Sequence, residues 1–273
     1  MKEIGEIKEI QSILYDALCY FDDFCRQNDI QYVLSNGTLL GAAKYGDFVP
    51  WDDDVDVLLS RADYDKLMSL TSINNGRYRL LCQEQVPTWR MPYAKLSCEN
   101  TVIREGEYDF GASFGLSVDI FPIDHWSPHL GVAKWQAFWG ECLKRLLICS
   151  IGGAFHTQKR GVKRLILRSI WLVGKAVGHR RLQRRILTMV RKASRKPSPY
   201  VGCRAWTCHL DGEIFPAAYF AETTRLAFRG REFPVIAQYE NYLSSLYGDW
   251  RAELPLDQQH SNHEIKVWYQ DGE

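Results

Sequence analysis

Residues 32–59 read YVLSNGTLLGAAKYGDFVPWDDDVDVLL. The stretch begins with a short apolar run, passes through a turn at Gly37 and Thr38, and ends in four aspartates that run into a second apolar run. Side chains of a strand repeat with a period of two, so Asp54 and Asp56 are predicted to share one face. Their Cα atoms then lie roughly 6.5–7 Å apart, which lets both carboxylates bind one hard cation.

The crowding of these carboxylates indicates a cation. Carboxylates this close repel one another, and some become protonated or displaced unless a cation neutralises them. Oxygen ligands suit Mg²⁺ or Mn²⁺, and Mg²⁺ in proteins typically binds a few carboxylates together with substrate phosphates. Asp52 is a further candidate ligand. The alternative is an acidic surface turn, because runs of acids are usually solvated.

The turn before the aspartates has the composition of a phosphate site. A glycine between a strand and a helix allows backbone N–H groups to approach a phosphate, and the helix N-terminus favours negative charge. We therefore expect Gly37 and Thr38 to contact phosphate oxygens. A strand, a Gly-Thr turn, a short helix and a strand that carries D-x-D together give the outline of a nucleotidyltransferase palm.

Two later segments supply further candidate groups. Residues 115–124 read as a strand in which Asp119 is enclosed by apolar residues. A carboxylate there is costly to bury unless it is paired or bound to metal, so we predict that Asp119 is a metal ligand or a general base. Residues 93–97 alternate as a strand that we expect to form a hairpin with residues 101–104. Lys95 in this strand is either a phosphate ligand or a lysine that extends to solvent.

The chain resembles the LicD family in five blocks that occur in the expected order. They are GTLLGAAKYGDFVPWDDDVDV at 37–57, YDKL at 64–67, YAKL at 93–96, VDIFPID at 118–124 and YLSSLYGDW at 242–250. This family includes bacterial phosphocholine transferases and is related to fukutin-related protein. The blocks touch most of the chain and leave a gap at about 127–205.

The resemblance implies an architecture for the whole chain. We expect an α+β fold, a nucleotidyltransferase-like palm with a mixed sheet flanked by helices and with a basic helical insertion. The expected domains are a catalytic core at 1–126, a basic insertion with tryptophans at 127–200, and a C-terminal part at 201–273 that completes the core.

The resemblance also implies a reaction and further site residues. The donor would be a CDP-alcohol, typically CDP-choline, and the acceptor a hydroxyl of a cell-surface glycan or of its lipid-linked precursor. In related members the aspartate that corresponds to Asp119 belongs to the metal site. Lys44 stands where relatives often carry arginine and is a second phosphate candidate. His260 and His263 lie in a tail where relatives carry histidines, so either could contact metal or phosphate.

Residues 159–196 hold fourteen Lys or Arg residues and no acid, and their apolar residues recur at helical spacing. Basic amphipathic helices with tryptophan suit an anionic membrane surface. The alternative is that they cover the palm and pair with acids elsewhere. Nucleic acid is disfavoured as a partner, since no known motif is present and no stacking aromatics interleave with the basic face.

The composition and the lengths of the apolar runs limit the partners and the cellular location that we expect. The net charge of +1 gives no global attraction to nucleic acid. The first residues, MKEIGEIKEI, do not read as a secretory signal, and no uninterrupted apolar run is long enough to span a membrane. We therefore expect a cytoplasmic protein, with peripheral binding to the inner face of the membrane left open. Two other functions stay open, namely nucleotidyl transfer to a sugar phosphate or nucleic acid, and a membrane-docked inactive binding protein.

Overall fold

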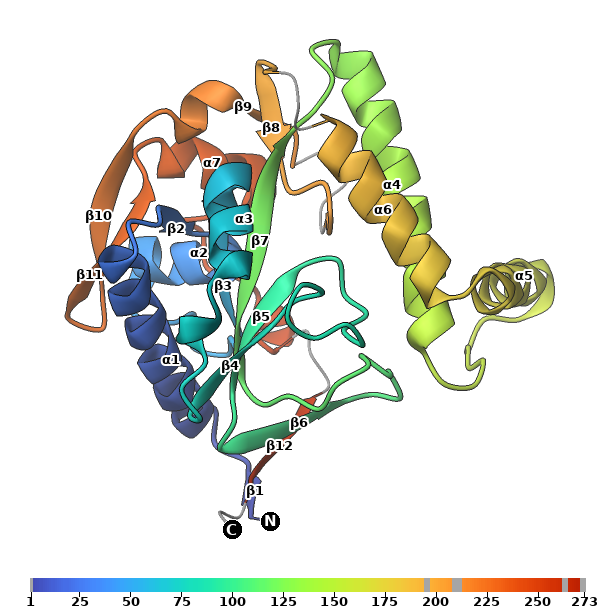
Figure 1. The fold of residues 1–273 in the computed structure, drawn as a ribbon, viewed down its shortest axis with the longest axis horizontal. Helices are drawn as coiled ribbons and strands as arrows, with labels where there is room; N and C mark the ends of the chain where they lie inside the picture. Colours follow the sequence, from blue (N-terminus) through green and yellow to red (C-terminus); the bar gives the residue numbers. More distant parts are fainter. Residues whose placement is uncertain (1, 194–196, 208–212, 262–264, 271–273) are drawn as a thin grey trace.

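The computed structural model describes residues 2–193, 197–207, 213–261 and 265–270 of the chain. Its centre is a mixed seven-stranded sheet with the order β2-β3-β7-β5-β4, which β8 and β9 extend from β7 (Figure 1). The strands are β2 (Tyr32–Leu34), β3 (Val55–Ser60), β4 (Tyr78–Leu81), β5 (Ala94–Cys98), β7 (Ser117–His125), β8 (Tyr200–Gly202) and β9 (Phe215–Pro216). β3 runs parallel to β7, and β5 runs antiparallel to it. The expected α+β class with a mixed sheet is confirmed.

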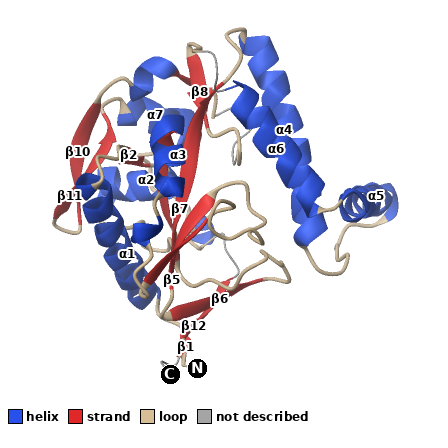
Figure 2. Cartoon of the chain, in the orientation of Figure 1, coloured by secondary structure: helices blue, strands red, loops and turns tan. Residues whose placement is uncertain are grey.

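Helices cover one face of this sheet. α1 (Ile7–Gln27) and α3 (Arg61–Ser69) lie on this face, whereas α2 (Asn36–Tyr45) contacts β3 and packs against α7 (Tyr239–Tyr247) (Figure 2). α1 packs against β5 and β7, and α3 packs against β3 and β7. Strand side chains alternate, so the fully buried Val55, Val57 and Ile120 point away from the face that carries Asp56 and Asp119. One face of the sheet is therefore core, and the other is available for chemistry.

Local sequence signals set the ends of these elements. α3 begins after Ser60, whose hydroxyl accepts a hydrogen bond from the Asp63 backbone N–H at 3.1 Å. α2 ends at Gly46, whose φ of 62° closes the helix in the left-handed conformation. The hairpin of β10 (Thr223–Phe228) and β11 (Arg231–Ile236) turns at Arg229 and Gly230. Short 3₁₀ turns cover Thr71–Ile73, Ala217–Phe220 and Leu256–Gln258.

The expected hairpin between residues 93–97 and 101–104 is wrong. β6 (Thr101–Glu105) pairs with β12 (Ile265–Tyr269), which also pairs with β1 (Glu3–Ile4). β5 is hydrogen-bonded to β4 on one edge and to β7 on the other, so it has no free edge for β6. β6 therefore joins a second, three-stranded sheet, in which the first and last strands, β1 and β12, are neighbours (Figure 1).

The basic segment and the helix before it form three helices on one side of the molecule (Figure 1). They are α4 (Leu130–Ile151), α5 (Gly161–Val177) and α6 (His179–Ala193). In α6, the apolar residues Leu182, Ile186 and Val190 are at most 3% exposed and belong to the main core. Of the two basic helices, α6 therefore packs its apolar side on the core, as the alternative of a covering helix predicts. α5, in contrast, is exposed over most of its length. None of the helices in the described parts of the chain combines the length and apolarity that a membrane span requires.

Candidate active site

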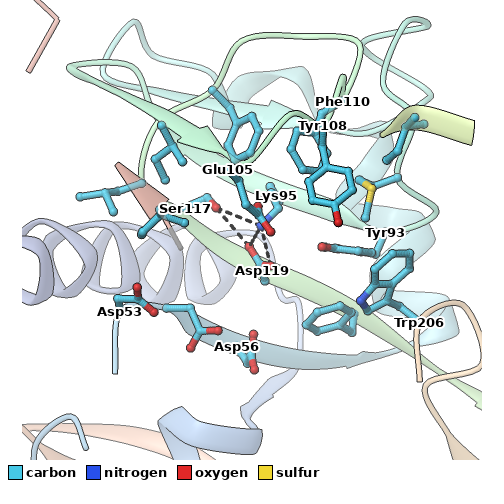
Figure 3. A pocket seen from close by; sticks show the side chains of 18 of the residues that line it. Asp53, Asp56, Tyr93, Lys95, Glu105, Tyr108, Phe110, Ser117, Asp119 and Trp206 are labelled. Carbon is cyan, nitrogen blue, oxygen red and sulfur yellow. Dashed lines mark hydrogen bonds and ion pairs between the residues drawn. The ribbon is translucent and has the colours of Figure 1, made fainter. Parts of the chain in front are cut away.

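A pocket of about 300 Å³ opens on the free face of the central sheet (Figure 3). Acidic, basic and aromatic side chains share its walls. Its lining includes Asp53, Asp54, Asp56, Tyr93, Lys95, Glu105, Tyr108, Phe110, Phe114, Ser117, Asp119, Phe121 and Trp206. The polar groups on β3, β5 and β7 come from the mixed sheet, which forms the floor, and Glu105 comes from β6 of the second sheet.

Three of the predicted residues form a row across three neighbouring strands. Asp56 on β3 lies opposite Asp119 on β7, and Asp119 lies opposite Lys95 on β5. Directly opposed residues project from the same face, with Cβ atoms roughly 4.5–5.5 Å apart in an antiparallel pair. The structure thus brings Asp56, Asp119 and Lys95 together, and Asp54 joins them in the pocket wall just before β3 begins.

Lys95 and Asp119 form a buried ion pair. The Nζ atom of Lys95 lies 2.6 Å from each carboxylate oxygen of Asp119, and Ser117 donates to the same carboxylate at 3.1 Å. Both charged residues are only 8% exposed. Burial by itself lowers the pKa of Lys95, but the Asp119 carboxylate outweighs burial and raises that pKa above its ordinary value. The lysine is therefore charged at neutral pH, and in this arrangement its partner is Asp119.

Asp56 is held from the side of α2. Asn36 donates its side-chain amide to Asp56 Oδ2 at 3.0 Å, and the Asp56 backbone N–H donates to Thr38 Oγ1 at 2.9 Å. Burial raises the pKa of Asp56 well above its ordinary value, and the Asp54 and Asp119 carboxylates raise it further. An acid in this environment requires positive charge nearby in order to stay ionised.

Sequence reasoning missed Asn36. Its backbone φ of 45° is in the left-handed region, which asparagine tolerates better than most residues. Tyr242 on α7 donates to Asn36 Oδ1 at 3.1 Å, which fixes the amide with its nitrogen towards Asp56. The available signal was an Asn next to Gly at a strand-to-helix turn. Its partner Tyr242, some two hundred residues later, could not be identified from local sequence.

The acidic groups fit a divalent cation in chemistry, because Asp54, Asp56 and Asp119 offer only oxygen ligands and repel one another. Their side chains do not converge as a ligand set here. Within the described ranges, no group of three or more His, Cys, Asp or Glu residues is gathered closely enough to hold a metal ion. Lys95 instead occupies both oxygens of Asp119. The predicted ligand set, which includes Asp52, therefore stays a prediction.

The remaining predicted residues lie around the pocket. A Cβ atom on Gly37 would lie 2.5 Å from Asp52 Oδ2, so this glycine makes room for a carboxylate. Thr38 is buried beneath β3 and positions the Asp56 backbone. Lys44 donates to the Ala252 carbonyl at 2.8 Å and pairs with Glu253 at 3.3 Å, away from the pocket lining. Phosphate contact by Gly37, Thr38 and Lys44 stays a prediction.

Of the two histidines of the tail, His260 is among the described residues. His260 is exposed and is not part of the pocket lining, and its Nδ1 lies 3.0 Å from the Ser261 carbonyl oxygen. His263 lies outside the described residues. Neither role that we expected for them is tested by this arrangement.

Residues 29–141 match the family described as LicD/FKTN/FKRP, nucleotidyltransferase domain. Over these residues the chain is similar to the LicD family. The chain is also 24% identical over 280 aligned positions to the lipopolysaccharide cholinephosphotransferase LicD of Haemophilus influenzae. That alignment covers 96% of this chain and 97% of the relative. The resemblance that the sequence blocks indicated is therefore confirmed.

The matched residues 29–141 contain Asp54 and the row of Asp56, Asp119 and Lys95, but not the whole pocket. Trp206 lies well beyond residue 141 and packs against Tyr93 with ring centroids 5.4 Å apart. Tyr93 also packs against Phe121 at 4.6 Å. These rings line the pocket together with Phe114, Tyr108 and Phe110, and we call the six the aromatic wall. Figure 3 shows Tyr93, Tyr108, Phe110 and Trp206 of this wall. Sequence reasoning left this wall undefined, because aromatic residues are usually core and Trp206 is distant in the chain from every acidic block.

Proposed function

We propose that the protein is a LicD-type phosphotransferase that moves phosphocholine from CDP-choline to a hydroxyl of lipopolysaccharide or of a lipid-linked glycan precursor. The activity of the relative from Haemophilus influenzae supports the reaction class. The observation that carries the proposal is the pocket, in which an acidic row lies below an aromatic wall. A palm of the nucleotidyltransferase type, with its basic helical insertion, is part of the same proposal.

The aromatic wall favours choline over other alcohols. The faces of aromatic rings attract cations, and this is how proteins commonly bind quaternary ammonium groups. The Lys95 ammonium already lies 5.6 Å from the ring centroid of Tyr93 and 5.5 Å from that of Phe114, so both rings can accept a cation. A trimethylammonium group needs no hydrogen-bond acceptor. The hydroxyls of ribitol or glycerol would lose hydrogen bonds to water at such a wall.

The acidic floor suits the diphosphate and the transfer step. The acceptor hydroxyl oxygen bonds to the phosphorus atom that carries choline, and the bond from that phosphorus to the CMP oxygen breaks. CMP leaves with the bonding electron pair, and the hydroxyl proton passes to a carboxylate, for which Asp119 is the candidate. Asp54 and Asp56, with Asp52 or Asp119, would hold Mg²⁺ or Mn²⁺, which neutralises diphosphate charge when bound. Lys95, if released from Asp119, would contact phosphate oxygens.

The test compares donors on the purified full chain. CDP-choline, CDP-ribitol, CDP-glycerol and CTP are each added with lipopolysaccharide and Mn²⁺, and with EDTA in place of Mn²⁺ as the control. We expect CMP release and a phosphocholine-bearing acceptor with CDP-choline in Mn²⁺, and loss of both in EDTA or in Asp56→Asn. Pyrophosphate release from CTP would replace this proposal with nucleotidyl transfer. Absence of turnover and of thermal stabilisation by every donor would indicate an inactive binding protein.

A further inference from the structure

The exposed apolar surface of the molecule is concentrated on α4 and α5. Among the residues that the structure describes, eleven of the fourteen exposed large hydrophobic side chains lie between residues 130 and 173. They are Leu130, Val132, Trp135, Phe138, Trp139, Val162, Leu165, Ile166, Leu167, Leu172 and Val173. Single exposed hydrophobic residues need no explanation, but so many on two helices that pack against each other indicate an interaction surface.

The aromatic part of this surface lies on α4. Phe138 and Trp139 follow Trp135 by three and four residues, so the three side chains share one face of the helix. Their rings contact one another, with centroids 5.8 Å apart for Trp135 and Trp139 and 5.9 Å apart for Phe138 and Trp139. They nevertheless remain 62%, 53% and 46% exposed. The rings therefore pack sideways against one another and leave their outer surfaces in water.

The same stripe of α4 continues to α5. Helical spacing carries it from Trp139 to Leu146 and Cys149. A Cβ atom on Gly174 would lie 2.7 Å from the Leu146 carbonyl oxygen and 2.9 Å from Cys149 Cβ, so α5 contacts the end of this stripe closely. The uncovered aromatic end of the stripe consequently faces the side of the molecule on which α5 lies.

α5 presents an apolar stripe beside unpaired basic residues. Val162, Leu165 and Ile166 are 71%, 64% and 54% exposed, and helical spacing places Leu172 and Val173 on the same side. Lys163, Arg164 and Arg168 form no ion pair with any described residue, and residues 142–196 contain no acid. In the folded protein, α5 therefore has the pattern of a helix that lies at an interface, with basic groups beside an apolar stripe.

We propose that α5, together with the aromatic end of α4, docks on the surface of an anionic phospholipid bilayer. Basic side chains are attracted by anionic headgroups, and tryptophan rings favour the boundary between headgroups and acyl chains. Charge also argues against a second copy as the occupant, because two such basic faces repel each other. α6 is excluded from the docking surface by its buried apolar side. The proposal does not depend on the reaction in the pocket.

The test is co-sedimentation of the full chain with vesicles of phosphatidylcholine alone or with a third of phosphatidylglycerol. Each Lys or Arg near an anionic surface strengthens binding about fivefold, so Arg164→Gln with Arg168→Gln is expected to weaken binding about 25-fold. The matched control removes the same charge from an exposed part of α6, Arg184→Gln with Arg185→Gln, and is expected to change binding less than about threefold. Circular dichroism verifies that both variants are folded.

A second measurement tests the aromatic part. Brominated lipids quench tryptophans that enter the bilayer boundary. Vesicles that contain them are therefore expected to lower the tryptophan fluorescence of wild type, and to lower that of Trp135→Phe with Trp139→Phe by a smaller fraction. The proposal is overturned if the α5 variant binds like wild type, if neutral vesicles bind equally well, or if the two proteins are quenched to the same extent. It is also overturned if size-exclusion chromatography shows dimers through this face and vesicle binding is absent.

Discussion

Lys95 neutralises one of the carboxylates that we assign to a metal site, so the substitution Lys95→Met tests the electrostatics of the whole pocket. In wild type, its ammonium is within 2.6 Å of both Asp119 oxygens in a setting where each partner is 8% exposed. Methionine keeps much of the side-chain length and can pack on the rings of Tyr93 and Phe114, but it removes the charge. Asp119 is then left buried next to Asp56 and Asp54 without a cation.

The cost follows from the burial of the pair. Removal of one partner of a buried ion pair typically destabilises a protein by about 3–5 kcal/mol, because the other charge is left uncompensated. We therefore expect Lys95→Met to lower the free energy of unfolding by about that amount in EDTA. A bound divalent cation would replace the lost charge. At a free concentration a hundred times its dissociation constant, it adds about 2.7 kcal/mol of stability, so Mn²⁺ should restore a large part of the loss.

Urea unfolding of wild type and variant, each in EDTA and in Mn²⁺, measures both effects. We expect Mn²⁺ to stabilise Lys95→Met more than wild type, since Lys95 no longer competes for Asp119. The matched control is Lys66→Met, a surface lysine whose Nζ donates to the Asp29 carbonyl, and its effect should stay within about 0.5 kcal/mol. A loss below about 1 kcal/mol in EDTA, or equal stabilisation of both proteins by Mn²⁺, would refute this reasoning.

Three further outcomes follow from contacts around the site. Asn36→Ala removes the hydrogen bond to Asp56 and leaves alanine at a φ of 45°, so CMP release should fall at least tenfold and stability by about 1–3 kcal/mol, whereas unchanged turnover would contradict a positioning role. Asp124→Ala removes the 2.7 Å partner of the half-buried Arg61 guanidinium and leaves it only Asp65 at 3.4 Å, so urea unfolding should show a loss of about 1–3 kcal/mol, and a loss below about 0.5 kcal/mol would contradict this. Burial and neighbouring arginines lower the pKa of His179, so the unfolded chain binds a proton at higher pH than the folded chain, and stability falls as pH drops below about 6.5. His179→Gln should flatten that part of the stability curve, and an unaltered slope would count against the assignment.

Much of the local structure could be predicted from sequence because its causes are local. The apolar spacing of α1, the Ser60 cap of α3 and the Gly46 stop of α2 each depend on residues within a few positions of one another. The alternation around Asp56 and the apolar enclosure of Asp119 also indicated two acidic strands. What local patterns could not supply was strand pairing. A tight turn after β5 favoured a hairpin with β6, yet both edges of β5 are occupied by other strands.

The basic segment, residues 159–196, is a second case in which local sequence patterns did not decide the tertiary packing. Both α5 and α6 combine apolar residues at helical spacing with basic residues, and sequence alone left membrane binding and packing as alternatives. The structure distinguishes the two helices, because Leu182 and Ile186 of α6 are buried in the core, whereas Leu165 and Ile166 of α5 are exposed. Periodicity specifies that a helix has an apolar side. It does not specify which partner covers that side.

By itself, the sequence determined the acidic motif, the strands that carry Asp56, Lys95 and Asp119, the helical character of the basic segment and the resemblance to the LicD family. The tertiary structure decided that Lys95 lies beside Asp119, that Asn36 and Tyr242 position Asp56, and that Trp206 completes the aromatic wall. The physical reason is that strand register and long-range packing depend on contacts between residues far apart in the chain. Such contacts cannot be inferred from the spacing of neighbouring residues.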